Sequence, residues 1–425
     1  MYHSTLRKVT CLLVCCMAIG DVAADQSEGT YLHRESDAFW LLAGPHARKF
    51  GPGQKFKNRL FLKPVYTDSE IEANNSSLEL KNARFALWGA LSDNTLAMLR
   101  LNFDGFNDRF GPPTGDATTN NGLKRVTENT VADAWIEYSF NRHLRVRAGQ
   151  DVVPYGLNMR TPVALMSFND RPVWTRQVFA RTRLIRDMQL QAFGQNESGN
   201  LLYAVGILQG TGIGGSLSES GSGPLEFRLA NDNNDKKDIA ARLVWATPVQ
   251  GLSLGASYYK GFQGYNGDPA SNYLATGGIT DEKHWGVDLR YQHGPLWVTA
   301  EYNHSEIDQM IVPQSSGTLI RSGKGEIDDW YVAMRYDGFS KRFSPKIRYE
   351  QFDTSSESGA MGDPDRIRGF LPPGTETTVG INFRLPTRAR PIKNEIGVEY
   401  TLYDEKNAAS DADNDLVALY WKVLY

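Results

Sequence analysis

The chain has 425 residues, a formal net charge of −3 and a mean hydropathy of −0.43. This balance argues against a nucleic-acid partner, which favours a basic excess, and the sequence contains no run of about 18 apolar residues that would form a transmembrane helix. All three cysteines, Cys11, Cys15 and Cys16, lie near the N-terminus, which excludes disulfides, cysteine zinc sites and thiol catalysis from the rest of the chain.

Residues 1–24 have the layout of a secretory signal peptide. Arg7 and Lys8 give a positive start, residues 9–19 are mostly apolar, and small residues precede a cleavage point after Ala24. A buried N-terminal helix is the alternative. We expect residues 25–55 to form a short periplasmic segment, which is too small to plug a barrel of the receptor type.

From residue 56 onward, sixteen stretches of about ten residues alternate apolar and polar side chains, and this is the length that a tilted strand needs to cross a bilayer. They cover residues 56–66, 78–91, 95–104, 131–140, 144–152, 186–195, 201–210, 238–247, 252–261, 283–293, 295–305, 328–337, 345–353, 376–385, 393–404 and 415–425. The first stretch is the least regular, because Pro64 interrupts it.

The connections between these stretches alternate in length. Short ones such as 92–94, 141–143 and 248–251 take turns with long polar ones such as 105–130 and 153–185. Short turns on one side and long loops on the other are typical of bacterial outer-membrane barrels.

Each stretch has one apolar and one polar face. In 295–305, Leu296 and Val298 alternate with Glu301 and Asn303. Lipid covers apolar faces on the outside of a barrel, and a closed barrel leaves no strand edge unpaired. We therefore predict an all-β fold, a transmembrane antiparallel barrel of about 16 strands over residues 56–425, in the bacterial outer membrane. A soluble β-sandwich or adhesin shows the same alternation and is the alternative.

The last stretch ends on an aromatic residue. The face that we expect to contact lipid carries Val417, Leu419, Trp421, Val423 and Tyr425. The other face carries Ala418, Tyr420 and Lys422, and we expect Lys422 to face water. Such an ending resembles the signal that outer-membrane barrels offer to their assembly machinery, so we expect that machinery, together with outer-membrane lipid and lipopolysaccharide, to be partners.

The stretches LELKNARFALWGAL (78–91), RAGQDVVPYG (147–156) and HWGVDLRYQHGPLWVTAEY (284–302) resemble the phosphate-selective porin O/P family of Gram-negative bacteria. The resemblance covers most of residues 56–425. It implies a homotrimer of sixteen-stranded barrels, each with a third long loop that folds inward and narrows the pore. In some family members, inward arginines and lysines guide phosphate-like anions, whereas others are general diffusion porins.

The third long loop carries six arginines in or beside it and a single acid, Asp170. The arginines, which we predict to form a solute-binding constriction, are Arg160, Arg171, Arg176, Arg181, Arg183 and Arg186. Confined guanidinium groups concentrate anions, and their fixed fork pairs with two oxygens of a phosphate or carboxylate. The alternative is that these arginines pair with carboxylates of the lumen.

The predicted inner wall is nearly balanced in charge. Its basic pore-lining residues are Arg145, Arg147, Arg242, Arg290, Arg335, Arg348 and Arg384, with Lys346 and Lys422. Its acids are Asp133, Glu137, Asp288, Glu301, Glu350, Glu395 and Glu399. The expected function is a passive channel for small hydrophilic solutes with a mild, phosphate-like anion preference. A non-conducting barrel that acts as an enzyme or adhesin is the alternative.

Two other motifs lack the context of a site. The glycine spacing of GTGIGG (210–215) fits a dinucleotide loop, but a serine-rich stretch follows it instead of a helix. The acids of DADND (411–415) lack the glycine and the later glutamate of an EF-hand. We therefore predict no cofactor, no metal site and no enzymatic activity.

Deleting Tyr425 is expected to lower insertion into the outer membrane while leaving synthesis intact, because the deletion removes the terminal aromatic residue of the closing strand. Fractionation of cells followed by immunoblotting measures the inserted protein, and the total protein is the control. Equal insertion of the deletion variant and the parent chain would contradict this role.

Overall fold

The computed structural model describes most of the predicted barrel. The described residues are 56–69, 77–102, 131–175, 186–210, 236–263, 280–308, 311–313, 319–321, 324–340, 342–356, 373–386, 393–405 and 415–424. The signal peptide and the periplasmic segment expected over residues 1–55 lie outside the described residues, so both stay predictions.

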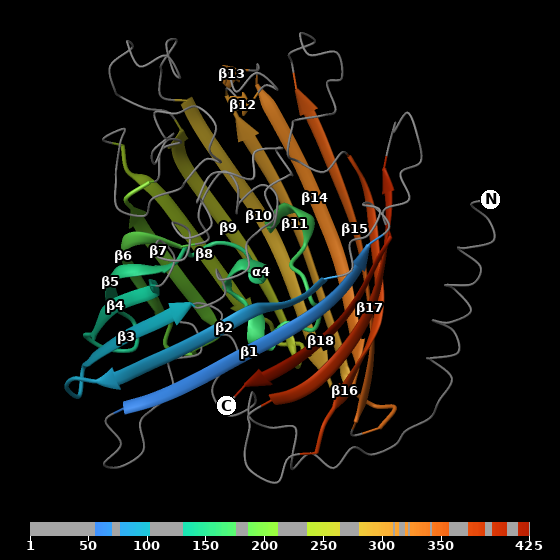
Figure 1. Cartoon of the computed structure of the whole chain (residues 1–425). Coiled ribbons are helices and arrows are strands. Elements are labelled where there is room, and N and C mark those ends of the chain that lie inside the picture. The colour runs from blue at the N-terminus through green and yellow to red at the C-terminus, as the bar shows by residue number, and fades with distance from the viewer. Residues whose placement is uncertain are drawn as a thin grey trace, which may run out of the picture. The chain divides into compact units, whose positions relative to one another are not determined.

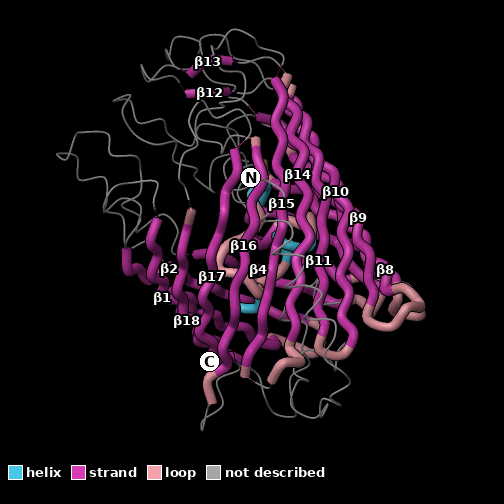
Figure 2. The backbone as a smooth tube through the Cα atoms, turned by 90° about the vertical axis from the view of Figure 1, so that its right-hand side faces the viewer, coloured by secondary structure: helices cyan, strands magenta, loops and turns pink. Residues whose placement is uncertain are grey.

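Sixteen strands form one closed ring in which neighbours pair antiparallel (Figures 1 and 2). Their bounds are β1 Phe56–Ser69, β2 Ser77–Ala90, β3 Thr95–Asn102, β4 Val131–Ser139, β5 Arg145–Val152, β6 Arg186–Gln195, β7 Leu201–Leu208, β8 Asp238–Ala246, β9 Leu252–Gln263, β10 Thr280–His293, β11 Leu296–Ile307, β14 Gly325–Tyr336, β15 Phe343–Ser356, β16 Gly374–Arg384, β17 Lys393–Glu405 and β18 Leu416–Leu424. The predicted all-β antiparallel barrel of about 16 strands is confirmed.

The ring closes where the first strand meets the last. Leu62 lies opposite Val423, and Tyr66 lies opposite Leu419. On its other side β1 pairs with β2, and the register shifts between Lys63 and Pro64. Proline has no N–H for a ladder bond, so it is tolerated where a bulge breaks the pairing. This is why β1 continues through Pro64 to Ser69.

The two faces of the wall differ as the alternation predicts. On β18, Val417, Leu419 and Trp421 are exposed on the outer face, whereas Ala418 and Tyr420 are buried on the inner face. The same pattern recurs on β4, where Ile136 and Tyr138 are exposed and Asp133 and Glu137 are buried. The apolar side of the closing strand is therefore its lipid-facing side.

Several strands run beyond the alternating pattern. β10 starts at Thr280 and β15 ends at Ser356, beyond the predicted bounds of 283 and 353. Ladder pairing needs only backbone groups, so strands extend past the part that lipid covers. Two short strands that alternation did not predict, β12 (Ile311–Pro313) and β13 (Leu319–Arg321), pair in a separate two-stranded sheet.

The residues after β5 form irregular structure with two short helices. These are α4 (Leu157–Arg160) and the 3₁₀-helix η3 (Val163–Leu165). No helix in the described part of the chain is long and apolar enough to cross a membrane. We refer to residues 153–175 as segment 153–175.

Replacing Val205 with arginine is expected to lower the free energy of unfolding by about 2–4 kcal/mol, because lipid at the middle of a strand cannot hydrate a guanidinium. Val205 is exposed on the outer face of β7. Guanidinium chloride titration in lipid vesicles, followed by tryptophan fluorescence, measures the effect. Glu197→Arg, in the turn between β6 and β7, is the matched control, and equal losses in both variants would contradict the lipid-facing position of Val205.

Candidate functional site

Segment 153–175 packs against the inner face of the barrel wall. Its apolar side chains Val153, Tyr155, Met159, Val173 and Trp174 form one cluster with residues of β7, β8, β9, β14 and β15. The Tyr155 and Trp174 rings stack with 5.2 Å between their centroids, and the Trp174 indole N–H donates to Ser305 Oγ on β11 at 2.9 Å. One short segment thus contacts many strands, which requires that it lie inside the ring that they form.

The start of α4 is fixed by one carboxylate from β11. Glu301 accepts hydrogen bonds from the backbone N–H groups of Leu157 at 3.0 Å and Asn158 at 3.1 Å. These N–H groups at a helix start have no partner within the helix, and a carboxylate satisfies both. Gly156 just before them has φ +61, and a Cβ there would lie 2.5 Å from Glu301 Oε1. The glycine of the RAGQDVVPYG stretch therefore permits this close approach.

Five consecutive backbone carbonyls, those of residues 166–170, accept hydrogen bonds from cations of the wall. The donors are Lys422 to Met166 O and Phe168 O at 3.0 Å each, Lys346 to Ser167 O at 2.8 Å, Lys63 to Asn169 O at 2.7 Å and Arg348 to Asp170 O at 2.8 Å. We call Lys63, Lys346 and Lys422 the lysine clamp. These lysines come from β1, β15 and β18, on both sides of the barrel seam.

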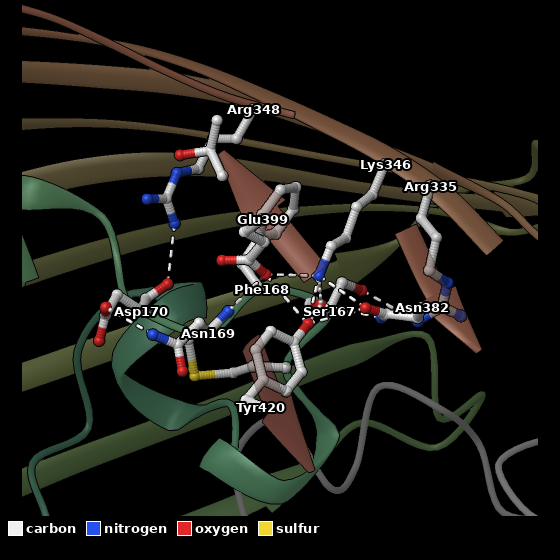
Figure 3. Close-up of polar contacts among 12 residues, drawn as sticks. Ser167, Phe168, Asn169, Asp170, Arg335, Lys346, Arg348, Asn382, Glu399 and Tyr420 are labelled. Atoms are coloured by element: carbon white, nitrogen blue, oxygen red, sulfur yellow. Dashed lines mark hydrogen bonds and ion pairs between the residues drawn. The ribbon is translucent and has the colours of Figure 1, made fainter. Parts of the chain in front are cut away.

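A carboxylate completes this contact region, as Figure 3 shows. Glu399 on β17 accepts the N–H of Asn169 at 2.8 Å and also bonds to Lys346 and to the Tyr420 hydroxyl. The Phe168 ring lies 5.1 Å from Lys346 Nζ, a cation–π distance. Segment 153–175 is therefore held at residues 166–170 through its carbonyls, one N–H and one ring.

The expectation that Lys422 faces water is wrong. Lys422 has no exposed surface, and its ammonium group contacts the carbonyls of Met166 and Phe168. The alternation correctly placed the side chain on the inner face. It could not show that a segment some 250 positions earlier in the chain covers that face.

Most wall arginines contact carboxylates. The pairs are Arg147 with Glu137 at 2.6 Å and with Asp151, Arg145 with Glu137 at 3.4 Å, Arg242 with Asp288 at 2.7 Å, Arg348 with Glu376 at 2.5 Å, Arg335 with Asp337 at 2.9 Å, and Arg384 with Asp337 at 3.1 Å. Arg290 donates to Gln292 at 3.2 Å and lies 5.3 Å from the Trp297 ring. Apart from Arg290, these predicted lining residues contribute paired charges, and the contact of all of them with solute stays a prediction.

The loop arginines have three different surroundings. Arg160 is buried, donates to Val152 O at 2.6 Å and lies 4.0 Å from Asp151. Arg186 on β6 bonds to Asp133 at 2.5 Å. Arg171 bonds to Asn158 O, to Asn158 Oδ1 at 3.1 Å and to Thr161 O at 2.9 Å. Arg176, Arg181 and Arg183 lie outside the described residues.

Two further arginines, Arg84 on β2 and Arg100 on β3, belong to the same region and were missed from the sequence. Arg100 pairs with Asp133 at 2.6 Å, beside Arg186. Burial, together with the nearby charges of Arg186 and Arg84, lowers the pKa of Arg171 to about 9. We call Arg84, Arg100, Arg171 and Arg186, together with Asp133, which pairs with Arg100 and Arg186, the arginine group.

Apolar neighbours explain why the sequence pattern did not identify Arg84 and Arg100 as inward-facing residues. The inner faces of β2 and β3 also carry Ala86, Trp88 and Met98, which form a buried apolar cluster with Trp135 of β4. With apolar residues on both faces, these strands lack the clean alternation that marks the inner side elsewhere. The polar positions were therefore not assigned to the lumen.

The described residues of the GTGIGG (210–215) and DADND (411–415) motifs form no dinucleotide or metal site. Gly210, at φ 75, donates its N–H to Asp187 at 3.0 Å, and Asp415 accepts a hydrogen bond from Tyr400. Residues 211–215 and 411–414 lie outside the described residues. Among those described, no three His, Asp or Glu side chains gather as metal ligands would.

Three solved structures share the fold of this chain. They are OmpF of Salmonella typhi in complex with daunomycin (TM-score 0.57, 13% identity, 89% of this chain and 99% of that one covered), a loop L8 deletion mutant of OmpT, an outer membrane protein of Vibrio cholerae (0.53, 12%, 87% and 99%), and the outer membrane channel DcaP of Acinetobacter baumannii (0.51, 13%, 89% and 99%). At such identities the likeness shows the fold alone. No curated protein sequence matches the chain.

The sequence itself matches a known family over most of the barrel. The profile described as phosphate-selective porin O and P matches residues 55–341, which is more than half of the chain. The closed barrel, its lipid-facing outer side and this match agree with one another. The chain therefore belongs to the phosphate-selective porin O and P family and is a porin of the bacterial outer membrane.

Proposed function

We propose that this porin is a passive channel for small hydrophilic solutes with a mild preference for anions, and that solutes pass the arginine group. Segment 153–175 is its constriction. The observation that carries the proposal is the set of partners of Arg171.

All three hydrogen bonds of Arg171 go to neutral oxygens, two of Asn158 and one of Thr161. Within the described part of the chain, no carboxylate is paired with this guanidinium, so its charge is not neutralised by direct contact. A pKa of about 9 leaves Arg171 positive at pH 7. Its close neighbours Arg84 and Arg186 add positive potential at the same place, which attracts small anions and repels small cations.

Partial solvent access at Arg100 and Arg186 supports a path beside these two residues. The side chains of Arg100, Arg186 and Arg145 are 15%, 19% and 23% exposed on the inner wall. On the other side, where segment 153–175 packs, the side chains of Arg242 and Lys346 are 0% exposed. The segment thus covers the wall at Arg242 and Lys346, whereas Arg100 and Arg186 keep some exposed surface.

The preference is mild, because most cations of the wall already have partners. The three clamp lysines donate to backbone carbonyls, and Arg147, Arg242 and Arg348 contact carboxylates. Opposed charges across a lumen orient polar solutes more than they select one sign. Chloride, phosphate and small carboxylates therefore fit the channel without a strict choice among them.

The wider assembly follows from the family and the position of the chain in the membrane. We include in the proposal a homotrimer, contact with lipopolysaccharide and membrane lipid, and assembly through the C-terminal strand. The exposed apolar outer face of the wall, with Leu190, Val205, Leu243 and Leu419, supports the contact with lipid.

Replacing Arg171 with glutamine is expected to shift the reversal potential in a tenfold KCl gradient toward the cation side. The ratio of chloride to potassium permeability should fall about two-fold, because one charge leaves a confined group of four arginines. Planar-bilayer recording of the purified protein measures both values. Lys260→Gln, which removes one charge from the outer face of β9, should leave the ratio unchanged.

Two results would overturn the proposed function. A folded barrel that shows no conductance steps would exclude a channel. A parent protein that prefers potassium over chloride would exclude the role of the arginine group.

A further inference from the structure

The lysine clamp is unusual because its charges lie out of water and close to backbone oxygens. Lys63, Lys346 and Lys422 are 1%, 5% and 0% exposed. A buried ammonium group needs hydrogen-bond acceptors to offset its lost hydration. In all three cases the acceptors include carbonyls of residues 166–170.

The contacts fix the conformation of the segment as well as its place. Lys422 bridges the carbonyls of Met166 and Phe168, two positions apart in a part of the segment whose backbone bends. Lys346 takes the carbonyl between them, that of Ser167, together with the side chains of Asn382, Glu399 and Tyr420. Alternate carbonyls are thus held by different lysines.

The clamp ends next to the residue that carries the anion preference. Lys63 holds Asn169 O, and Arg348 holds Asp170 O at 2.8 Å, immediately before Arg171. The Arg171 side chain donates hydrogen bonds to Asn158 Oδ1 and Thr161 O, which lie 13 and 10 positions earlier in segment 153–175. The position of its guanidinium therefore depends on where residues 166–170 are held.

We infer that Lys63, Lys346 and Lys422 are positioning residues that hold segment 153–175 against the wall and so set the width of the channel and the place of Arg171. They do not bind solute. The inference rests on the proposed function, in which this segment is the constriction. An ammonium group has three donors, and Lys346 already has four oxygens within hydrogen-bond distance.

Lys422→Met tests the inference, because it removes both carbonyl contacts and keeps a side chain of similar length. Loss of one of the three clamp lysines loosens the segment at Met166 and Phe168, so the mean single-channel conductance is expected to rise about two-fold and its distribution to broaden, with a smaller chloride preference. The heat-dependent gel mobility of the folded barrel shows that the variant is intact. Lys260→Met on the outer face removes the same charge and is the matched control.

A lysine that attracts solute would behave differently in the same recording. Its loss would lower the chloride permeability and leave a narrow distribution of conductances. That result, or a Lys422→Met variant indistinguishable from Lys260→Met, would overturn the inference. A parent channel that prefers potassium would instead refute the proposed anion preference. The change in mean conductance and in the width of its distribution would still test the role of the lysine clamp.

A second experiment shows whether Lys422 acts on the channel through segment 153–175 or directly. When residues 166–170 are deleted, Lys422→Met is expected to change the conductance no further, because its partners are gone. A persisting effect would show that Lys422 acts on the channel directly.

If the chain without residues 166–170 does not insert into the membrane, the Tyr420→Phe variant is tested instead. This variant keeps every charge and removes a hydroxyl that donates to Ser167 O at 3.2 Å. It is expected to broaden the conductance distribution without reversing the chloride preference, and an unchanged distribution would count against the clamp.

Discussion

The structure depends on the hydrogen bonds between β1 and β18. In lipid, no water is available for backbone N–H and C=O groups, so a sheet that crosses the membrane must close on itself. Pairing of Leu62 with Val423 and of Tyr66 with Leu419 achieves this closure. Because the ring is closed, it has an inside, and every second side chain of each strand must find a place there.

That inside is occupied largely by polar contacts within the chain. Arginines pair with carboxylates across strands, as Arg147 on β5 does with Glu137 on the neighbouring β4, and lysines donate to the carbonyls of segment 153–175. Removal of one partner leaves a charge buried without compensation, which costs more than the pair contributes. Opposed charges in the described part of the lumen therefore act first as internal structure, and the proposed role in solute passage falls to charges such as that of Arg171, whose hydrogen bonds go to neutral oxygens.

Alternation along the strands was sufficient to predict the barrel, its strand number and its two faces, because a lipid-covered strand repeats with a period of two. Register irregularities such as the one at Pro64 and the full lengths of β10 and β15 were less accessible, because backbone pairing continues without an apolar pattern. Arg84 and Arg100 were missed because Trp88 and Met98 share their face. Lys422 was placed on the correct face with the wrong surroundings, since no local pattern reveals a contact across some 250 residues.

The position of the lysine clamp at the seam has a consequence for the order of folding. Lys63 lies on the first strand and Lys422 on the last, and these strands become neighbours only when the ring is complete. Residues 166–170, from the middle of the chain, can therefore reach both lysines only in a finished barrel. The contacts of residues 166–170 with both seam lysines therefore form late, after β1 and β18 have paired.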